Sequence, residues 1–212
     1  MLYKETIESG TLELLRKLQS EALLSSFNLV GGTSLALRMG HRKSVDLDLF
    51  TKDDFGLQEL KEFLVSKYNL QVSYEKGKTL KGFINNVKID LIKYDYPQVC
   101  SVETIGGIRF ESIPDVIAMK LSAICDNGSR IKDFIDIAFL SSKYSFDEML
   151  KFYSAKFPNS NQVMLAKALV YFADIDFDED IVMLNCDFNW DVIAKRLDDM
   201  TLQRDKVFKP IL

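Results

Sequence analysis

The sequence predicts an α+β protein, with a mixed β-sheet flanked by helices in its N-terminal part and an all-helical C-terminal part. Three observations lead to this prediction. Apolar runs with the period-two alternation of strands occur up to residue 110. Glycine or paired asparagines separate several of these runs. From residue 112 onward, apolar residues recur only at helical spacing. We therefore expect two domains, 1–111 and 112–212.

The first part of the chain changes between helical and strand patterns. Leucines recur at helical spacing in 3–26 and in Phe55–Tyr68, whereas Val45–Phe50 alternates as a strand does. Thr33 or Ser34 has a side chain that can cap a short helix. In order, the expected elements are a helix at 3–26, a strand at Leu29–Val30, a helix at Leu35–Met39 that Gly40 ends, a strand at Val45–Phe50 and a helix at Phe55–Tyr68.

A sheet section and then a series of helices follow. Gly77 and the pair Asn85-Asn86 interrupt alternating segments, as hairpin turns do. Pro114 suits the first turn of a helix. The expected elements are strands at 70–76, 79–84, 87–94 and Ile105–Phe110, and helices at Pro114–Cys125, Ile131–Lys143, 146–156, 160–173 and 189–206.

Composition argues against several classes of function. The formal net charge of −4 provides no general attraction to nucleic acid, and we expect no recognition of a DNA sequence. Residues 171–200 contain nine Asp and Glu but only two Lys and Arg, so we expect no phosphate-binding surface there. Three cysteines without a CxxC pair, and a single histidine, His41, argue against a zinc site.

The chain also lacks the patterns of a secreted or membrane protein. Its N-terminus carries acids where a signal peptide needs a basic and then an apolar run. No window approaches 18 uninterrupted apolar residues, the length typical of a membrane span. Three unpaired thiols suit a reducing compartment. We therefore expect a cytoplasmic protein that does not bind a membrane.

The stretch "LVGGTSLALRMGHRKSVDLDLF" carries the strongest chemical signal. In a strand, Asp46 and Asp48 share one face, while Val45, Leu47 and Leu49 share the other. Two such carboxylates repel each other and resist burial unless a cation lies between them. Mg²⁺ is the natural cation, because it prefers carboxylate and phosphate oxygens. The alternative interpretation of this pair is two solvent-facing acids on an edge strand.

The glycines upstream fit the other half of such a site. Gly31 and Gly32 allow a phosphate to approach the backbone closely, and the N–H groups that begin the next helix provide donors and a positive dipole end. The basic run His41-Arg42-Lys43 lies between the glycines and the acids. Taken alone, GGTS is an ordinary turn. Together, the two halves predict a triphosphate site beside a metal site.

The same residues resemble a known signature. "VGGTS", and "DLDLF" after Thr33–Val45, look like the signature of the DNA polymerase β-like nucleotidyltransferase superfamily. The longer form, "GGTSLAL…GHRKSVDLDLF", resembles more narrowly the AbiEii/MenT-like nucleotidyltransferase toxins of bacterial toxin–antitoxin systems. The resemblance covers about 28–140 and implies a nucleotidyltransferase-type N-terminal domain.

The superfamily pattern calls for a third carboxylate on a neighbouring strand. In "NVKIDLIKY", Asp90 lies on the face of Lys88 and Ile92, opposite the apolar residues. The resemblance implies that Asp46, Asp48 and Asp90 bind two Mg²⁺ ions, for which Mn²⁺ can substitute. The alternative for Asp90 is an exposed acid on an amphipathic strand.

Two helical segments resemble the next motifs of the family. "IPDVIAMKLSAI" supplies Lys120, which the resemblance makes a ligand of nucleotide phosphate, and "GSRIKDFIDIAFL" supplies Asp133 and Asp136. The alternative for Lys120 is a surface lysine with a buried stem. The alternative for Asp133 is a structural ion pair, and for Asp136 a structural or orienting role is the better interpretation. The implied domain 112–212 thus contributes Lys120 and Asp133 to the site.

These residues predict transfer of a nucleoside monophosphate from an NTP to an acceptor hydroxyl, with release of pyrophosphate. The resemblance implies a tRNA 3′ end or a protein as acceptor, and an antitoxin as partner. Two alternatives remain: a DxD-type glycosyltransferase, and an inactive nucleotide-binding module of the same fold.

The expected catalytic residues are Asp46, Asp48, Asp90, Lys120 and Asp133. The expected nucleotide-binding residues are Gly31, Gly32, Thr33, Ser34, Arg42 and Lys120. Lysines that can follow an RNA backbone, or simply solubilise edge strands, are Lys76, Lys78, Lys81, Lys88 and Lys93.

Overall fold

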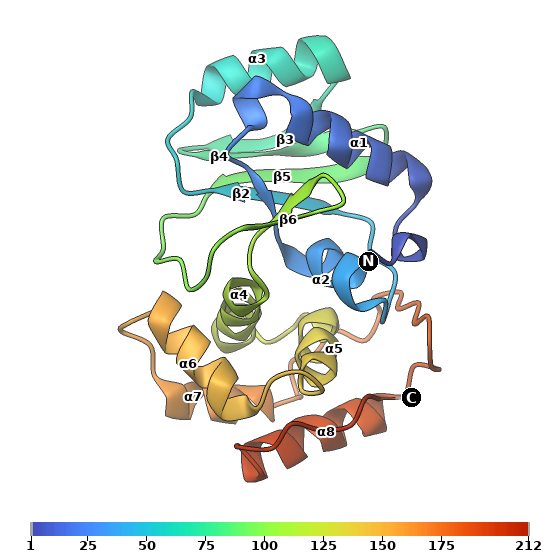
Figure 1. Ribbon diagram of the computed structural model, residues 1–212, viewed down its shortest axis with the longest axis vertical. Helices are drawn as coiled ribbons and strands as arrows, with labels where there is room; N and C mark the ends of the chain where they lie inside the picture. Colours follow the sequence, from blue (N-terminus) through green and yellow to red (C-terminus); the bar gives the residue numbers. More distant parts are fainter. Residues whose placement is uncertain (1, 212) are drawn as a thin grey trace. The chain divides into compact units, whose positions relative to one another are not determined.

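The computed structural model describes residues 2–211, which divide into two compact units (Figure 1). The first unit comprises Met1–Tyr96 and Val102–Glu111, and the second comprises Pro97–Ser101 and Ser112–Leu212. The expected boundary near residue 112 therefore differs in one respect, because the short segment Pro97–Ser101 groups with the second unit. None of the described helices has the length and apolar character needed to cross a membrane.

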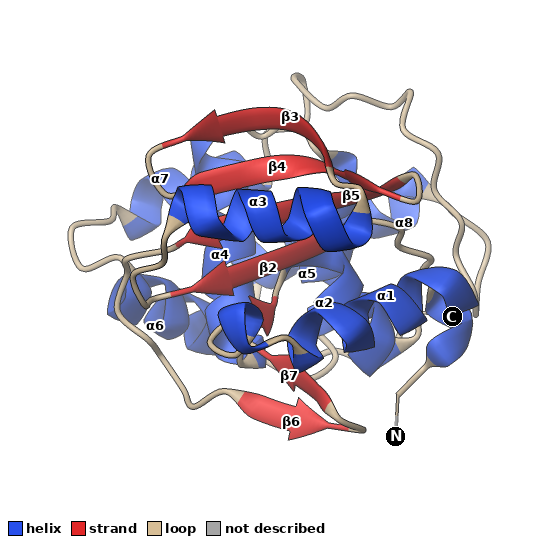
Figure 2. Cartoon of the chain, turned by 90° about the horizontal axis from the view of Figure 1, so that it is seen from above, coloured by secondary structure: helices blue, strands red, loops and turns tan. Residues whose placement is uncertain are grey.

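A seven-stranded mixed sheet forms the centre of the first unit, which confirms the predicted α+β class (Figure 2). The strand order is β3-β4-β5-β2-β1-β7-β6; β2 pairs with β5 and β1 with β7 in parallel, and the other neighbours are antiparallel. The strands are β1 (Asn28–Leu29), β2 (Leu47–Thr51), β3 (Gln71–Lys76), β4 (Thr79–Ile84), β5 (Val87–Lys93), β6 (Glu103–Ile105) and β7 (Ile108–Phe110). The helices are η1 (Lys4–Thr6), α1 (Ser9–Ser20), η2 (Ala22–Leu24), α2 (Gly31–Met39) and α3 (Leu57–Tyr68).

Several predicted elements of this unit are wrong in detail, among them the first helix and the last strand. The long helix expected at 3–26 is α1 flanked by two 3-10 turns, because Glu21 leaves the helix with extended backbone and its carboxylate accepts hydrogen bonds from Lys67 and Tyr68. The strand expected at Ile105–Phe110 is a hairpin. Gly106 and Gly107 both have positive φ, which suits a two-residue turn between β6 and β7.

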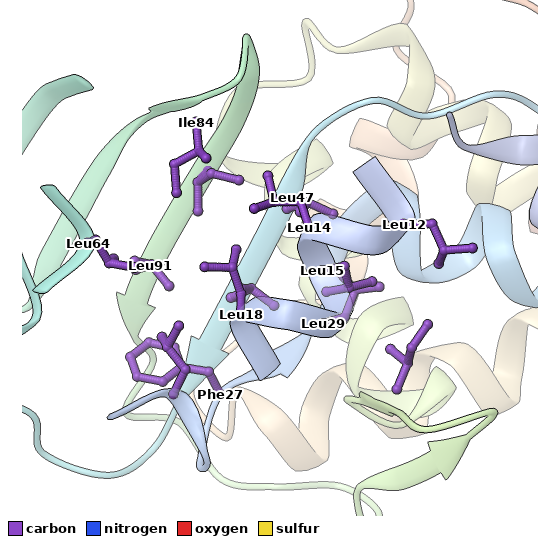
Figure 3. Close-up of a cluster of buried hydrophobic side chains, with 14 of the residues drawn as sticks. Leu12, Leu14, Leu15, Leu18, Phe27, Leu29, Leu47, Leu64, Ile84 and Leu91 are labelled. Carbon is purple, nitrogen blue, oxygen red and sulfur yellow. The ribbon is translucent and has the colours of Figure 1, made fainter. Parts of the chain in front are cut away.

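The apolar core of the first unit lies between one face of the sheet and the helices α1 and α3 (Figures 1 and 3). Leu47 and Leu49 of β2 and Leu91 of β5 are at most 1% exposed and belong to this core. Because side chains alternate along a strand, Asp48 and Asp90 lie on the opposite face. The helix-covered face thus fixes the register that keeps both acids away from the apolar core.

The named elements of the second unit are helices: α4 (Ile113–Asp126), α5 (Ile131–Leu140), α6 (Phe146–Lys156), α7 (Gln162–Leu169) and α8 (Trp190–Leu202). The fully buried ring of Phe134 meets the rings of Phe172 and Trp190 edge to face, at centroid distances of 6.0 and 6.3 Å. Ser145 and Glu148 form a capping box at the start of α6. The helical character expected after residue 112 is present.

A buried carboxylate connects Pro97–Ser101 to α4. Asp115 is 0% exposed, and Nζ of Lys156 on α6 lies 2.7 Å from its Oδ1. Its oxygens also accept the N–H groups of Val99 and Cys100, both at 2.9 Å, and the hydroxyl of Ser112. Burial raises the pKa of Asp115, but the hydrogen bonds from Lys156, Ser112 and the two backbone donors together bring that pKa below the ordinary 3.8.

We expect Asp115→Asn to destabilise the protein at pH 7 by about 3–5 kcal/mol, because Lys156 would remain buried without its counter-ion. The carboxylate has a lowered pKa when folded, so its contribution is present above the unfolded pKa and is lost as the pH falls below about 4. Urea unfolding at pH 7 and pH 3 measures this contribution. The difference in the free energy of unfolding between wild type and variant is expected to be smaller at pH 3 than at pH 7. Asp126→Asn, at an exposed position of the same helix, is the control; equal losses from both variants would contradict the prediction.

Candidate active site

Two aspartates meet on the polar face of the sheet in the first unit. Parallel pairing of β2 and β5 places Asp48 directly beside Asp90, while Leu47 and Leu49 pair with Ile89 and Leu91. Asp90 is 6% exposed and Asp48 is half-buried. Neighbouring like charges repel each other in a sheet unless a cation compensates them. This register therefore concentrates negative charge at one place on the sheet.

The third acid, Asp46, lies outside the strand. The strand begins at Leu47 and not at the expected Val45, and Val45 is 61% exposed, so its predicted place on the buried face is wrong. The backbone carbonyl of Asp46 accepts a hydrogen bond of 2.5 Å from the hydroxyl of Thr33, and this bond directs the residue toward α2 instead of toward a neighbouring strand. The half-buried Asp46 thus precedes β2 beside the start of α2.

The glycine pair opens α2 itself. The structure begins this helix at Gly31, four residues before the expected start at Leu35, and Val30 occupies the N-cap without a side-chain cap. Gly31 has φ +68°, and an added Cβ would lie 2.2 Å from Oδ2 of Asp48. The carboxylate of Asp48 therefore lies directly against the first residue of the helix, in space that only glycine leaves open.

The hydroxyls of Thr33 and Ser34 serve the local structure. Thr33 is 1% exposed and contacts Ser44 at 2.8 Å as well as the carbonyl of Asp46. Ser34 is 0% exposed and accepts a hydrogen bond of 2.5 Å from Nη2 of Arg38. That Thr33 and Ser34 contact a phosphate stays a prediction. Such a contact would be made by the backbone N–H groups at the start of α2, because these groups are available to anions.

Arg42 approaches the second glycine. It is 3% exposed, its Nη1 donates to the carbonyl of Lys43 at 3.0 Å, and a Cβ added to Gly32 would lie 2.5 Å from its Nη2. The first turn of α2 therefore has a carboxylate against Gly31 and a guanidinium against Gly32. A planar guanidinium beside helix N–H groups is suited to phosphate oxygens.

The carboxylates of the first unit suit a divalent cation only in part. Among residues 2–211, no three His, Cys, Asp or Glu side chains are placed to bind one metal ion, so the expected triad of Asp46, Asp48 and Asp90 is not assembled. Asp90 Oδ2 pairs with Lys81 at 2.5 Å, and Asp90 Oδ1 is buried without a hydrogen-bond partner. A buried oxygen of this kind, next to a second carboxylate, is the donor chemistry that Mg²⁺ prefers.

Sequence reasoning did not recognise Lys81 as the partner of Asp90, and treated it as one lysine of a basic surface. That surface is partly neutralised, because Lys78 and Lys93 both pair with Asp54, at 3.4 and 3.3 Å. The sequence did contain the signal for Lys81. A two-residue turn at Asn85-Asn86 fixes the hairpin register, and that register places residue 81 opposite residue 90.

The second unit contains a buried ionic cluster of Lys120, Asp133 and Asp136. Nζ of Lys120 on α4 lies 2.5 Å from Oδ1 of Asp133 and 2.8 Å from Oδ2 of Asp136, both on α5. All three are at most 6% exposed, and Arg130 lies 3.9 Å from Asp133. The ion pair that was the alternative interpretation for Asp133 is present. The catalytic role of Lys120 and Asp133 stays a prediction.

Comparison with solved structures identifies the fold. MenT4, a nucleotidyltransferase toxin from Mycobacterium tuberculosis, superposes with a TM-score of 0.60 at 16% identity, over 90% of this chain and 82% of that chain. JHP933 from Helicobacter pylori superposes with a TM-score of 0.57 at 20% identity, over 94% and 93%. At these identities the likeness concerns the fold, which is that of nucleotidyltransferases.

The family follows from sequence. The model described as "Nucleotidyl transferase AbiEii toxin, Type IV TA system" matches residues 13–99 and 82–206, and the chain belongs to this AbiEii family of nucleotidyltransferases. The uncharacterized protein aq_aa25 of Aquifex aeolicus is 34% identical in an alignment of 171 residues, with coverage of 76% of this chain and 81% of that protein. The predicted family and enzyme class are confirmed, and the glycosyltransferase alternative is wrong.

Gly31→Ala is expected to reduce nucleotidyl transfer by about 100-fold, because its Cβ would displace the carboxylate of Asp48, and small displacements of reacting groups have effects of this size. Gly77→Ala is the matched control, because Gly77 also has positive φ (+60°) but has no atom within 4 Å of an added Cβ. Both variants lose about 1–2 kcal/mol of stability from the strained φ, measurable by urea unfolding. Equal transfer rates in the two variants would show that the position of Asp48 does not matter.

Proposed function

We propose that the protein transfers a nucleoside monophosphate from an NTP to an acceptor hydroxyl in a Mg²⁺-dependent reaction, as the toxin of a toxin–antitoxin pair. The single observation that carries this proposal is the position of Asp48. Its carboxylate lies against the first residue of α2 and beside Asp90, so a carboxylate pair and a helix N-terminus meet at one place. An NTP with its bound cation needs both features together.

In the proposed reaction, the triphosphate binds at the start of α2, where the N–H groups of Gly32 and its neighbours and the guanidinium of Arg42 oppose its charge. Asp48 and Asp90, together with Asp46, would hold two Mg²⁺ ions, or Mn²⁺ in their place. When bound, the metal neutralises charge on the phosphates and lowers the barrier to displacement. The protein contributes position and preorganised charge, and little covalent chemistry.

The bond changes balance as follows. The acceptor oxygen forms a bond to the α-phosphorus, and the bond between that phosphorus and the β-bridging oxygen breaks. Pyrophosphate takes the electron pair of the broken bond. The proton of the acceptor hydroxyl passes to Asp90, whose Oδ1 is buried without a hydrogen-bond partner. Lys120 and Asp133 are proposed to assist, with Lys120 as the ligand of nucleotide phosphate.

The acceptor and the antitoxin are the open parts of the proposal. The protein is incubated with each of the four NTPs, labelled at the α-phosphate, with Mg²⁺ and either bacterial total tRNA or a protein extract. Label on RNA assigns a tRNA acceptor, and label on protein assigns a protein hydroxyl. No label on either with any NTP overturns the proposal in favour of an inactive nucleotide-binding module.

The toxin role is tested separately in cells. Expression of the wild-type protein is expected to arrest growth of a bacterial host, while expression of Asp48→Asn at the same level is not. Co-expression of a cognate antitoxin, the partner that the family implies, is expected to restore growth. Equal growth with wild type and variant would contradict the toxin role.

A further inference from the structure

Lys81 holds the position at Asp90 that a metal ion would take in the proposed site. It lies on β4 directly opposite Asp90 on β5, and β5 also pairs with β2, which carries Asp48 (Figure 2). Nζ of Lys81 lies 2.5 Å from Oδ2 of Asp90. Asp90 therefore has a carboxylate neighbour on one strand and an ammonium neighbour on the other.

The burial of the two partners differs. The side chain of Asp90 is 8% exposed, and its second oxygen, Oδ1, is buried without a hydrogen-bond partner. The side chain of Lys81 is 36% exposed. A lysine ammonium on a flexible four-carbon stem can turn into solvent without leaving a buried charge behind, whereas the carboxylate of Asp90 cannot. Asp90 needs a cation at this position, and the lysine can leave it.

We propose, on the basis of the function proposed above, that Lys81 is a positioning residue whose ammonium exchanges with the divalent cation at Asp90. In the metal-free protein it neutralises Asp90 and limits its repulsion of Asp48. When Mg²⁺ binds, the ammonium leaves Oδ2 and is free to approach the triphosphate or the acceptor. Lys81 thereby lowers the affinity for metal, and it stabilises the sheet when metal is absent.

The test is Mn²⁺ binding, followed by the loss of the free-ion electron paramagnetic resonance signal, without substrate. Lys81→Met is expected to bind Mn²⁺ about three- to fivefold more tightly than wild type, because it removes a competing ion pair that is partly exposed to solvent. Its Tm without metal is expected to be lower, and the rise of Tm with saturating Mn²⁺ larger. A merely structural lysine would lower Tm without increasing affinity.

Two further variants make the test specific. Lys61→Met is the matched control, because Lys61 forms its ion pair with Glu75, at 3.0 Å, and not with Asp48 or Asp90. This variant should bind Mn²⁺ with the affinity of the wild type. In Lys81→Met/Asp90→Asn, the gain from the lysine variant should disappear, because the two residues act through one interaction. Lys81→Gln keeps the methylene chain and ends in an uncharged amide. If Lys81→Met does not fold, the Mn²⁺ affinity of Lys81→Gln is compared with that of the wild type instead.

The outcomes separate this inference from the proposed function. Mn²⁺ affinity in Lys81→Met that equals or falls below that of wild type overturns the exchange, while leaving nucleotidyl transfer in place. A gain that persists in the double variant also overturns it. Failure of wild type and all variants to bind Mn²⁺ would overturn both the exchange and the metal-dependent reaction.

Discussion

Asp90→Asn is expected to lower nucleotidyl transfer by about 10³-fold or more, with the protein still folded. The substitution keeps the shape of the side chain but removes the charge that pairs with Lys81 and stands beside Asp48. Loss of one preorganised charge from a reaction centre has effects of this size. Asp48→Asn should have an equal effect, because its carboxylate lies against Gly31 at the start of α2.

Stability should change little in these variants. Removing one of two neighbouring carboxylates relieves repulsion, and the ammonium of Lys81 can turn to solvent. Asp54→Asn is the matched control, since Asp54 pairs with Lys78 and Lys93 but is exposed. Transfer rates and urea unfolding are measured on the same preparations. A variant that retains a tenth of the wild-type rate, or one that unfolds, would indicate that the pair has a structural role.

Lys120→Met is expected to lower the free energy of unfolding by about 3–5 kcal/mol, because two buried carboxylates would lose their shared ammonium. Asp136 is 0% exposed and Asp133 is 3% exposed, so water cannot replace that charge readily. Urea unfolding at pH 7 measures the loss. Lys132→Met is the control, because its ion pair with Glu179 is partly exposed and is worth at most about 1 kcal/mol.

A triple variant separates structure from catalysis in this cluster. Lys120→Met/Asp133→Asn/Asp136→Asn removes the three buried charges together and leaves the exposed Arg130 near them, so it should recover most of the stability that Lys120→Met loses. If Lys120 binds nucleotide phosphate as the family resemblance implies, the folded triple variant should still transfer poorly. A triple variant that is stable and fully active would assign the cluster to structure alone.

Local patterns were sufficient for most of the fold. Alternation of apolar and polar residues predicted β4 and β5 closely and β2 except for its start, because one face of each must be buried in the core. The two-residue turn at Asn85-Asn86 also determines that Lys81 lies opposite Asp90. Asp48 and Asp90 as neighbours followed from the family pattern, and the parallel register agrees with that expectation.

Contacts between distant residues were not predictable in this way. The early start of α2 depends on a positive φ at Gly31 and on space left beside Asp48. Asp46 leaves the strand because Thr33, 13 residues earlier, binds its carbonyl. Lys156 lies 41 residues from Asp115, and no periodicity indicates which of several lysines would pair with a buried acid. Such pairs are decided by packing of whole helices.

The central claim is that the bond between the α- and β-phosphates of an NTP breaks at the carboxylate pair of Asp48 and Asp90. The most direct measurement compares one NTP labelled at the α-phosphate with the same NTP labelled at the γ-phosphate. We predict that the α-label becomes attached to the acceptor and that the γ-label appears in pyrophosphate. With Asp90→Asn, neither labelled product should form. Attachment of γ-label to the acceptor, or release of γ-label as inorganic phosphate alone, would contradict the account.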